Sequence, residues 1–274
     1  MLLDGKYELD RLLGEGGYGK VYSGRNLSTG QSCAVKVSLD KFEFDSTDDD
    51  PIESLKREFN HLCSIPPHPN CIRVFGAGEN YYVMEKFGLP LSSSAFQAER
   101  TKPQFIYDVM VGIFRALSHY HKNGFLHLDL KPSNILASLD WETGRVNIKI
   151  IDPLCPPPFE TSSEDFFFGT PEYAAPEFME GKEGETLKAD LYSVGLILYE
   201  LLMSRRAFNA KSAEEHYWLH RDAVYKPVCP SWHWSIRLLV DDLLNPDPSL
   251  RPKDARRCLR RLKLNRLVRR SKKE

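Results

Sequence analysis

The chain has 274 residues, 42% of them hydrophobic and 27% charged, which is typical of a globular protein with a buried core and excludes a disordered chain. Its formal net charge of −1 gives no overall reason to expect nucleic acid or a membrane as a partner. The charge is unevenly distributed, because residues 256–274 carry 10 Lys and Arg with 1 acidic residue, whereas the rest carries 27 Lys and Arg with 37 acidic residues.

The first predicted element, residues 7–24, is a hairpin of two strands whose turn, Gly14–Gly19, has the sequence G-E-G-G-Y-G. Glycines let backbone amides approach phosphate oxygens because no Cβ stands in the way. The pattern equally fits a hairpin without a ligand. It also fits the dinucleotide-binding fingerprint, but that fingerprint requires a helix directly afterwards, and Lys20–Ser23 favours a strand.

A further strand is predicted at Cys33–Val37, where alternation places Ala34 and Lys36 on one face. A lysine within an apolar strand is unfavourable unless its charge is matched. Either Lys36 lies on an edge strand and extends its ammonium group into water, or it pairs with ATP phosphates and with a carboxylate from elsewhere in the chain.

Residues 51–62 form the predicted helix that supplies this carboxylate, since its apolar residues recur on one stripe. Glu58 is the expected partner of Lys36, because it directly precedes a member of the stripe. Glu53 is the second candidate, and either glutamate could instead lie on a solvated face. The acidic run Asp48–Asp50 before the helix is interpreted as a charged loop, and recruitment of a basic substrate is the alternative.

Two more strands are predicted at Ile72–Phe75 and Tyr81–Met84, from their apolar and aromatic residues. The apolar pattern from Phe105 to His121 then predicts a long helix. Gly124 follows it as a suitable end, because glycine readily adopts the left-handed conformation that closes many helices.

The stretch His127–Asn134, with the sequence H-L-D-L-K-P-S-N, is the most informative part of the chain. Asp129 offers a base, Lys131 a cation and Asn134 an amide oxygen that can hold Mg²⁺, and phosphoryl transfer needs these three groups together. After a predicted hairpin, Asp152 follows a strand end as a second metal ligand, because Mg²⁺ prefers oxygen ligands. A lone Asp-x-Lys is usually a surface ion pair, but the full string disfavours that interpretation.

With these motifs the chain resembles the protein kinases of the serine/threonine type. The resemblance implies ATP and Mg²⁺ as cofactors and a protein substrate with a Ser or Thr acceptor. It implies that Asp129 orients the acceptor hydroxyl, that Lys131 contacts the transferred phosphate, and that Asn134 and Asp152 hold the metal. The residues implied in nucleotide binding are Leu13, Gly14, Gly16, Gly19, Val21, Ala34, Lys36, Glu58, Glu85, Phe87 and Leu136.

The fold that the resemblance implies is α+β and bilobal. A small, sheet-rich lobe is expected at residues 1–86, a larger helical lobe at 87–258 and a basic tail at 259–274. Met84 would be the gatekeeper of a hinge near residues 84–88, where the backbones of Glu85 and Phe87 hold the adenine edge.

The resemblance extends over about residues 7–260. Gly169–Glu177 is similar to the family's substrate-docking segment, and Asp190–Glu200 to the buried helix that anchors the catalytic stretch. Arg251 is similar to the arginine that forms a buried clamp with the last glutamate of the docking segment. Thr170, taken with the catalytic lysine, indicates Ser or Thr rather than Tyr as the acceptor.

One departure from the family pattern concerns regulation. Leu128 occupies the place of the arginine that usually precedes the catalytic aspartate and binds a phosphate on the activation loop. We therefore do not expect phosphorylation within Thr161–Ser163 to act as a switch by that route.

The second departure is Asp152-Pro153-Leu154 in place of Asp-Phe-Gly. Pro153 removes a backbone donor and Leu154 lacks the access to positive φ that glycine has, so we expect a restricted metal loop. The two departures favour a nucleotide-binding scaffold with little or no transfer, whereas the retained catalytic residues favour a protein kinase. A small-molecule kinase is the third alternative, and the docking segment Gly169–Glu177 disfavours it.

Two further features have less specific interpretations. His216 and His220 are four residues apart, but the glutamate of the zinc-protease motif is missing, so a partly exposed helix is expected rather than a metal site. The leucines of the basic tail predict a final helix on the larger lobe, followed by a frayed basic end. Nuclear import, anionic lipid and nucleic acid are its alternative uses.

The cellular location is predicted from composition. No apolar run is long enough to span a bilayer, and the first residues lack the layout of a signal peptide. The six cysteines are scattered without a C-x-x-C pair, which favours thiols over a disulfide framework or a zinc site. We therefore expect the cytoplasm or the nucleus.

Overall fold

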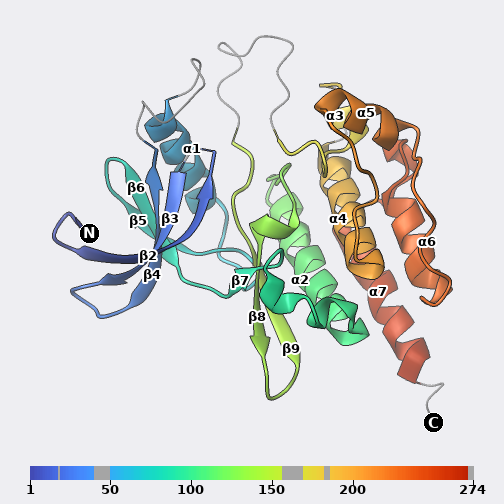
Figure 1. The fold of residues 1–274 in the computed structure, drawn as a ribbon, viewed down its shortest axis with the longest axis horizontal. Helices are drawn as coiled ribbons and strands as arrows, with labels where there is room; N and C mark the ends of the chain where they lie inside the picture. Colours follow the sequence, from blue (N-terminus) through green and yellow to red (C-terminus); the bar gives the residue numbers. More distant parts are fainter. Residues whose placement is uncertain (18, 40–49, 156–168, 182–185, 271–274) are drawn as a thin grey trace. The chain divides into compact units, whose positions relative to one another are not determined.

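The computed structural model describes residues 1–17, 19–39, 50–155, 169–181 and 186–270 (Figure 1). The chain forms two compact units. The first consists mainly of Met1–Pro67 and Cys71–Phe87, and the second mainly of His68–Asn70, Gly88–Leu154 and the chain after residue 166. The predicted α+β class is confirmed, and the lobe boundary expected after residue 86 lies one residue from this division.

An antiparallel sheet of six strands, in the order β1-β2-β3-β4-β6-β5, makes up most of the first unit. The predicted hairpin and the predicted strand around Lys36 are present, and the strand expected from Ile72 begins at Val74. The strands are β1 (Leu2–Leu3), β2 (Tyr7–Gly16), β3 (Gly19–Asn26), β4 (Ser32–Ser38), β5 (Val74–Ala77) and β6 (Tyr81–Glu85).

Both faces of this sheet are buried near β4. On one face Cys33 and Val35 join a core cluster with residues of β2 and β6. Alternation places Ala34 and Lys36 on the other face, and the strand register pairs Lys36 with Tyr82 of β6. This second face receives helix α1 (Pro51–Ser64), which lies beside the sheet in Figure 1.

Helix α1 begins as its sequence predicts. The Asp50 carboxylate accepts a hydrogen bond from the Ile52 N–H at 3.0 Å, and Pro51 occupies the first turn, where its missing N–H costs nothing. Asp48 and Asp49 lie outside the described residues. Leu55 and Leu62 are buried on the apolar stripe.

Helices dominate the second unit, and α2 (Pro103–Lys122) is its centre. Ile113, Phe114 and Leu117 are fully buried, and the helix ends before Gly124, whose φ of 79° confirms the expected left-handed end. In Figure 1, α4 (Thr186–Met203) lies between α2 and α6 (Trp234–Leu243). The other helices are α3 (Pro176–Met179), α5 (Ala213–Arg221) and α7 (Ala255–Arg270), with short 3₁₀ turns at Ser94–Phe96, Glu99–Thr101, Pro132–Asn134 and Pro248–Leu250.

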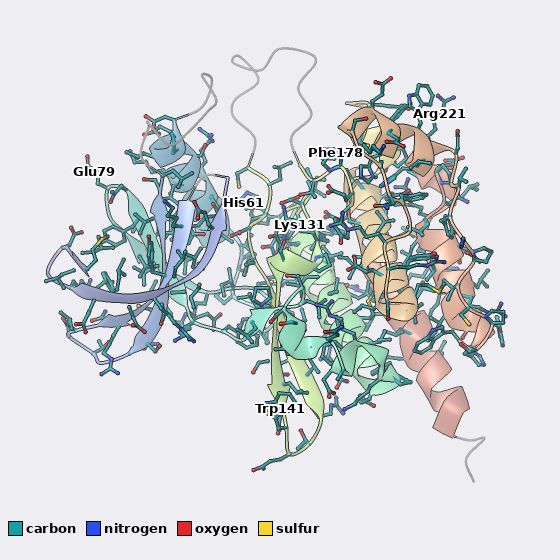
Figure 2. All side chains as sticks on the ribbon, in the orientation of Figure 1. His61, Glu79, Lys131, Trp141, Phe178 and Arg221 are labelled. Atoms are coloured by element: carbon teal, nitrogen blue, oxygen red, sulfur yellow. The ribbon has the colours of Figure 1, made fainter. Side chains whose placement is uncertain are left out.

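A small sheet completes this unit, and its second strand begins directly after the catalytic stretch, His127–Asn134. The strands of this sheet are β7 (Leu89–Pro90), β8 (Ile135–Asp140) and β9 (Arg145–Ile150). The β8–β9 hairpin is the one predicted before Asp152, and Trp141 lies at its exposed tip (Figure 2). Helix α2 packs so closely on β9 that a Cβ on Gly112 would come within 2.3 Å of Ile148.

The expectation that His216 and His220 lie on a partly exposed helix is confirmed, since Trp218 of the same helix is 46% exposed. Both histidines are on α5, as predicted, but their exposed fractions are only 5% and 0%. His220 is covered by the rings of Phe208 and Tyr192, which come from other segments of the chain. Their burial is a tertiary effect, so the helix sequence alone gave no sign of it.

The basic tail is largely helical. Helix α7 starts at Ala255, before the tail boundary expected at residue 259, and buries Ala255, Cys258 and Leu262. Residues 271–274 at the end of the tail lie outside the described residues, as does Thr161–Ser163. Within the described ranges, no helix combines the length and the apolar character needed to cross a membrane. All six cysteines are thiols rather than disulfides.

Candidate functional site

Lys36 and Glu58 form the predicted ion pair within the first unit. The Lys36 Nζ lies 2.8 Å from Oε1 and 2.7 Å from Oε2 of Glu58, and both side chains are almost completely buried. Glu53, the alternative partner, instead contacts Lys56 on the exposed side of α1. The edge-strand interpretation of Lys36 is therefore excluded, because β4 lies between β3 and β6.

The glycine-rich turn between β2 and β3 has space that the protein itself does not fill. A Cβ on Gly14 would meet no heavy atom within 4 Å, and one on Gly16 would come no closer than 3.9 Å to Gly19 O. Gly19 differs, because its Cβ would lie 2.6 Å from the Val37 carbonyl oxygen. Packing therefore explains Gly19, whereas Gly14 and Gly16 suit a phosphate group that approaches the backbone closely.

The other residues expected in nucleotide binding lie in both units. Ala34 is buried, and Val21 and Phe87 are partly exposed in the first unit, while Leu13 is 38% exposed. The Glu85 N–H donates to the Arg73 carbonyl at 2.9 Å, so the carbonyl is the group of the Glu85 backbone suited to an adenine amine. Leu136 is a partly exposed residue of β8 in the second unit.

The Asp129 carboxylate is the centre of a hydrogen-bond network in the second unit. Its Oδ1 accepts a bond from the Thr170 hydroxyl at 2.7 Å, and its Oδ2 accepts bonds from Lys131 Nζ at 2.8 Å and Asn134 Nδ2 at 2.9 Å. Lys131, labelled in Figure 2, also donates to the Thr170 hydroxyl at 2.7 Å. The structure thus brings together three predicted site residues and Thr170.

The catalytic stretch is held by buried Asp190 of α4. Asp190 accepts hydrogen bonds from the backbone N–H groups of His127 at 3.0 Å and Leu128 at 2.7 Å, and it lies 2.8 Å from His121 Nε2. Burial alone would raise the pKa of Asp190, but the hydrogen bonds from the His121 side chain and from the backbone N–H of His127 hold the pKa below its ordinary value. An ionised Asp190 therefore anchors the stretch, as predicted.

Leu128 has a strained backbone at this anchor. Its φ is 59°, a left-handed value that is unfavourable for a bulky side chain. The bond from its N–H to Asp190 is one contact that stabilises this conformation. The strain shows that the catalytic stretch is fixed by its surroundings rather than by local preference.

His127 links the catalytic stretch to the metal loop. It is fully buried, and its Nε2 lies 2.9 Å from the Ile151 carbonyl oxygen. Because a carbonyl only accepts, Nε2 carries the proton. Burial lowers the pKa of His127 despite the nearby carboxylates, so the ring is neutral.

The metal loop takes its left-handed residue at an unexpected position. Asp152 has a φ of 53°, and Leu154 is not among the described residues with positive φ. Aspartate tolerates this region better than leucine does. The Leu154 N–H donates to the His127 carbonyl at 2.8 Å, and Pro153 is buried. These contacts tie the loop to the catalytic stretch, and its expected restriction stays a prediction.

The donors near the catalytic stretch fit Mg²⁺. The Nδ2 of Asn134 points to Asp129, with both the carboxylate and the carbonyl oxygen as acceptors at 2.9 Å. The amide oxygen of Asn134 therefore faces away from Asp129. Together with the Asp152 carboxylate it gives an all-oxygen donor set, which Mg²⁺ prefers.

The predicted clamp between Glu177 and Arg251 is present and buried. Their closest atoms are 2.5 Å and 2.8 Å apart in a two-pronged pair. The remaining N–H groups of Arg251 donate to the carbonyl oxygens of Lys188, Asn245 and Pro246. All five guanidinium donors are thus satisfied, which holds the docking segment against α4 and the turn before α7.

Two residues next to the site were missed by the sequence reasoning. The Tyr82 hydroxyl donates to Glu58 Oε1 at 2.7 Å, and His121 contacts Asp190. Neither belongs to a motif. His121 lies near the end of a recognisable helix, but the sequence does not show which face of that helix meets α4.

These features are typical of the protein kinase class: a lysine–glutamate pair with a glycine turn, and an Asp-x-Lys stretch with two oxygen donors that suit Mg²⁺. The protein kinase domain family matches residues 7–261, so the chain belongs to the protein kinase family.

The relatives found by sequence comparison include plant kinases. CBL-interacting protein kinase 2 of Oryza sativa subsp. japonica is 31% identical over 255 residues, 90% of this chain and 55% of that protein. CBL-interacting serine/threonine-protein kinase 20 of Arabidopsis thaliana is 31% identical over 90% of this chain and 56% of that protein. The chain thus spans about half the length of these relatives.

Proposed function

We propose that this protein is a serine/threonine protein kinase that transfers the γ-phosphate of ATP to hydroxyl groups of protein substrates. The observation that carries the proposal is the network in which Thr170, Lys131 and Asn134 all bind the Asp129 carboxylate. The serine/threonine kinases among its relatives support the acceptor class.

In this proposal Asp129 aligns the acceptor hydroxyl and receives its proton. The hydroxyl oxygen forms a bond to the γ-phosphorus while the bond from that phosphorus to the bridging oxygen of ADP breaks. Lys131 stabilises the negative charge of the transferred group, and Lys36, oriented by Glu58, binds the ATP phosphates. Mg²⁺ held by Asn134 and Asp152 would neutralise charge on the phosphates.

Phosphate transfer to a generic protein substrate tests the acceptor class. With radiolabelled ATP and Mg²⁺, we expect label on serine and threonine and none on tyrosine after acid hydrolysis of the substrate. Asp129→Asn keeps the size of the side chain and removes the base, so it should lose at least about a hundredfold in rate. Label on a small metabolite but not on protein would contradict the proposal.

A nucleotide-binding scaffold is the second candidate. Leu128 and the Asp152-Pro153-Leu154 loop favour it, since the loop is tied by its Leu154 N–H to the His127 carbonyl. A scaffold would bind ATP without transferring phosphate. The same assay separates the two candidates when nucleotide binding is measured in parallel.

We further propose that the protein works inside the cell. The six thiols support this proposal, because disulfides are rare in reducing compartments. Fluorescence microscopy of a tagged full-length protein tests it, and an extracellular signal would contradict it.

The basic surface of α7, with Arg256, Arg257 and Arg260 exposed, would contact an anionic partner.

A further inference from the structure

The buried carboxylate of Glu58 has a third bonding group besides the lysine ammonium. The Tyr82 hydroxyl donates to its Oε1 at 2.7 Å, and the Tyr82 side chain is completely buried. Oε1 therefore receives one bond from Lys36 and one from Tyr82, while Oε2 receives a bond from Lys36.

The strand register explains how the three side chains meet. Lys36 of β4 and Tyr82 of β6 are directly paired across the sheet, so their side chains project from the same face. Glu58 reaches that face from α1, and Phe59 next to it packs its ring 5.9 Å from the Tyr82 ring. Tyr82 thus holds α1 to the sheet by both its hydroxyl and its ring.

The bond from Tyr82 to the buried Glu58 carboxylate matters most when Lys36 also binds a second partner. Lys36 has to share its ammonium protons between Glu58 and ATP phosphates once nucleotide is bound. A buried charge that loses part of its partner is strongly disfavoured unless another donor compensates. The Tyr82 hydroxyl cannot reach water, so it stays available to Glu58 throughout.

We propose that Tyr82 is a positioning residue for phosphoryl transfer: its hydroxyl keeps Glu58 oriented toward Lys36 while Lys36 binds the nucleotide phosphates. This inference rests on the proposed kinase function. Tyr82 acts through Glu58 and does not touch the reacting atoms.

The neighbouring residue provides a matched control. Tyr81 lies on the same strand, its side chain is on the opposite face in the core cluster, and its hydroxyl also donates to a carboxylate, Asp4 Oδ2, at 2.6 Å. Tyr81→Phe therefore removes the same kind of hydrogen bond from the same strand without touching Glu58. Tyr82→Phe removes one oxygen atom and keeps the ring against Phe59.

Steady-state kinetics of both variants test the proposal. Tyr82→Phe should lower kcat/KM for ATP about tenfold and leave the KM of the protein substrate within about twofold, since only the nucleotide side is affected. Tyr81→Phe should leave both constants within about twofold of the wild type, whatever it does to thermal stability. Equal kinetics for Tyr82→Phe and Tyr81→Phe would overturn the proposal.

A double-mutant cycle with Glu58→Gln separates positioning from general stabilisation. If Tyr82 works through Glu58, Tyr82→Phe should cost nothing further in kcat/KM once Glu58 is Gln. A full additional loss in the double variant would show that Tyr82 acts by another route and would overturn the proposal.

Direct binding of ATP with Mg²⁺ keeps the test valid if no phosphate transfer occurs. A wild type that binds ATP without transfer would refute the kinase function alone, and Tyr82→Phe should then bind ATP about fivefold more weakly than Tyr81→Phe does. Equal affinities would refute the role of Tyr82. A wild type that binds no nucleotide would refute both proposals.

Discussion

Among the single residues, Thr170 connects the docking segment Gly169–Glu177 to Asp129 through its hydroxyl. It donates to Asp129 and accepts from Lys131, each at 2.7 Å. A hydroxyl can do both at once, whereas a methyl group of the same size can do neither. Thr170 therefore fixes the side chains of Asp129 and Lys131, although it lies about forty positions away in the sequence.

Thr170→Val should lower kcat about tenfold to a hundredfold and leave the KM for ATP within about twofold, because the change misplaces Asp129 and leaves the nucleotide side intact. Thr170→Ser keeps the hydroxyl and should recover most of the rate. Steady-state kinetics of the two variants check this. Equal losses in both would contradict the account, because Thr170→Ser keeps the hydroxyl that makes the two hydrogen bonds.

His220 makes stability depend on pH. Burial lowers its pKa to about 4, and its Nδ1 lies 2.9 Å from the Ala174 carbonyl oxygen, so the ring is neutral in the folded protein. In the unfolded chain its pKa is about 6.5. Between these values the unfolded chain binds a proton that the folded protein does not, so unfolding becomes more favourable as the pH falls.

We expect the free energy of unfolding to fall as the pH is lowered from about 6.5 to about 4, with His220 contributing at most about 3 kcal/mol. His220→Gln can still donate to the Ala174 carbonyl but does not titrate, so its profile should be flatter. His68, His127 and His216 also have lowered pKa values, so part of the pH dependence of the free energy of unfolding remains in the variant. Urea unfolding at pH 7 and pH 4.5 measures the difference, and parallel profiles would refute the assignment.

At the element scale, the clamp between Glu177 and Arg251 joins three segments of the second unit. The Arg251 side chain is completely buried, and every guanidinium donor has an acceptor. Removing one partner of such a pair leaves an unmatched buried charge. The Arg206–Glu172 pair, 3.4 Å apart, is exposed and provides a comparison within the same unit.

Arg251→Ala should lower the free energy of unfolding by about 3–5 kcal/mol, because Glu177 stays buried without its partner. Arg206→Ala should lower it by less than about 1 kcal/mol, because water and salt screen an exposed pair. Chemical denaturation of the two variants compares them. Similar losses would contradict the assignment of Arg251 as a buried clamp.

The elements themselves were predictable where their pattern is local. Helix α1 follows from its apolar stripe and proline, and the β2–β3 hairpin follows from its glycines. The catalytic residues were predictable because Asp129, Lys131 and Asn134 lie within six positions, so the geometry of one turn brings them together.

Contacts between distant segments were predictable only where a local pattern or the resemblance supplied the partner. Arg251 was assigned from the resemblance, and Glu58 was assigned from the apolar stripe of its helix. The buried environment of His220 was not predicted, since Phe208 and Tyr192 belong to no motif. The contact between Tyr82 and Glu58 was not predicted for the same reason. The sequence shows that residue 82 lies on a strand, but only the strand register shows that it is paired with Lys36.

For the whole molecule, the central question is whether the altered metal loop supports phosphoryl transfer. The other residues that the kinase pattern assigns to catalysis are retained, and the first unit contains an intact Lys36–Glu58 pair. The left-handed conformation that the loop needs falls on Asp152 rather than on Leu154. The replacement of glycine by leucine is therefore accommodated, and transfer remains the function that the geometry supports best.

The most direct measurement is phosphate transfer and ATP binding on the same preparations of the wild type and Asp152→Asn. We predict that the wild type transfers phosphate to protein in the presence of Mg²⁺, and that Asp152→Asn, which weakens a metal ligand, loses at least about a hundredfold in rate while it stays folded. A wild type that binds ATP, shown by a raised melting temperature, but transfers no phosphate would contradict the account and identify a scaffold.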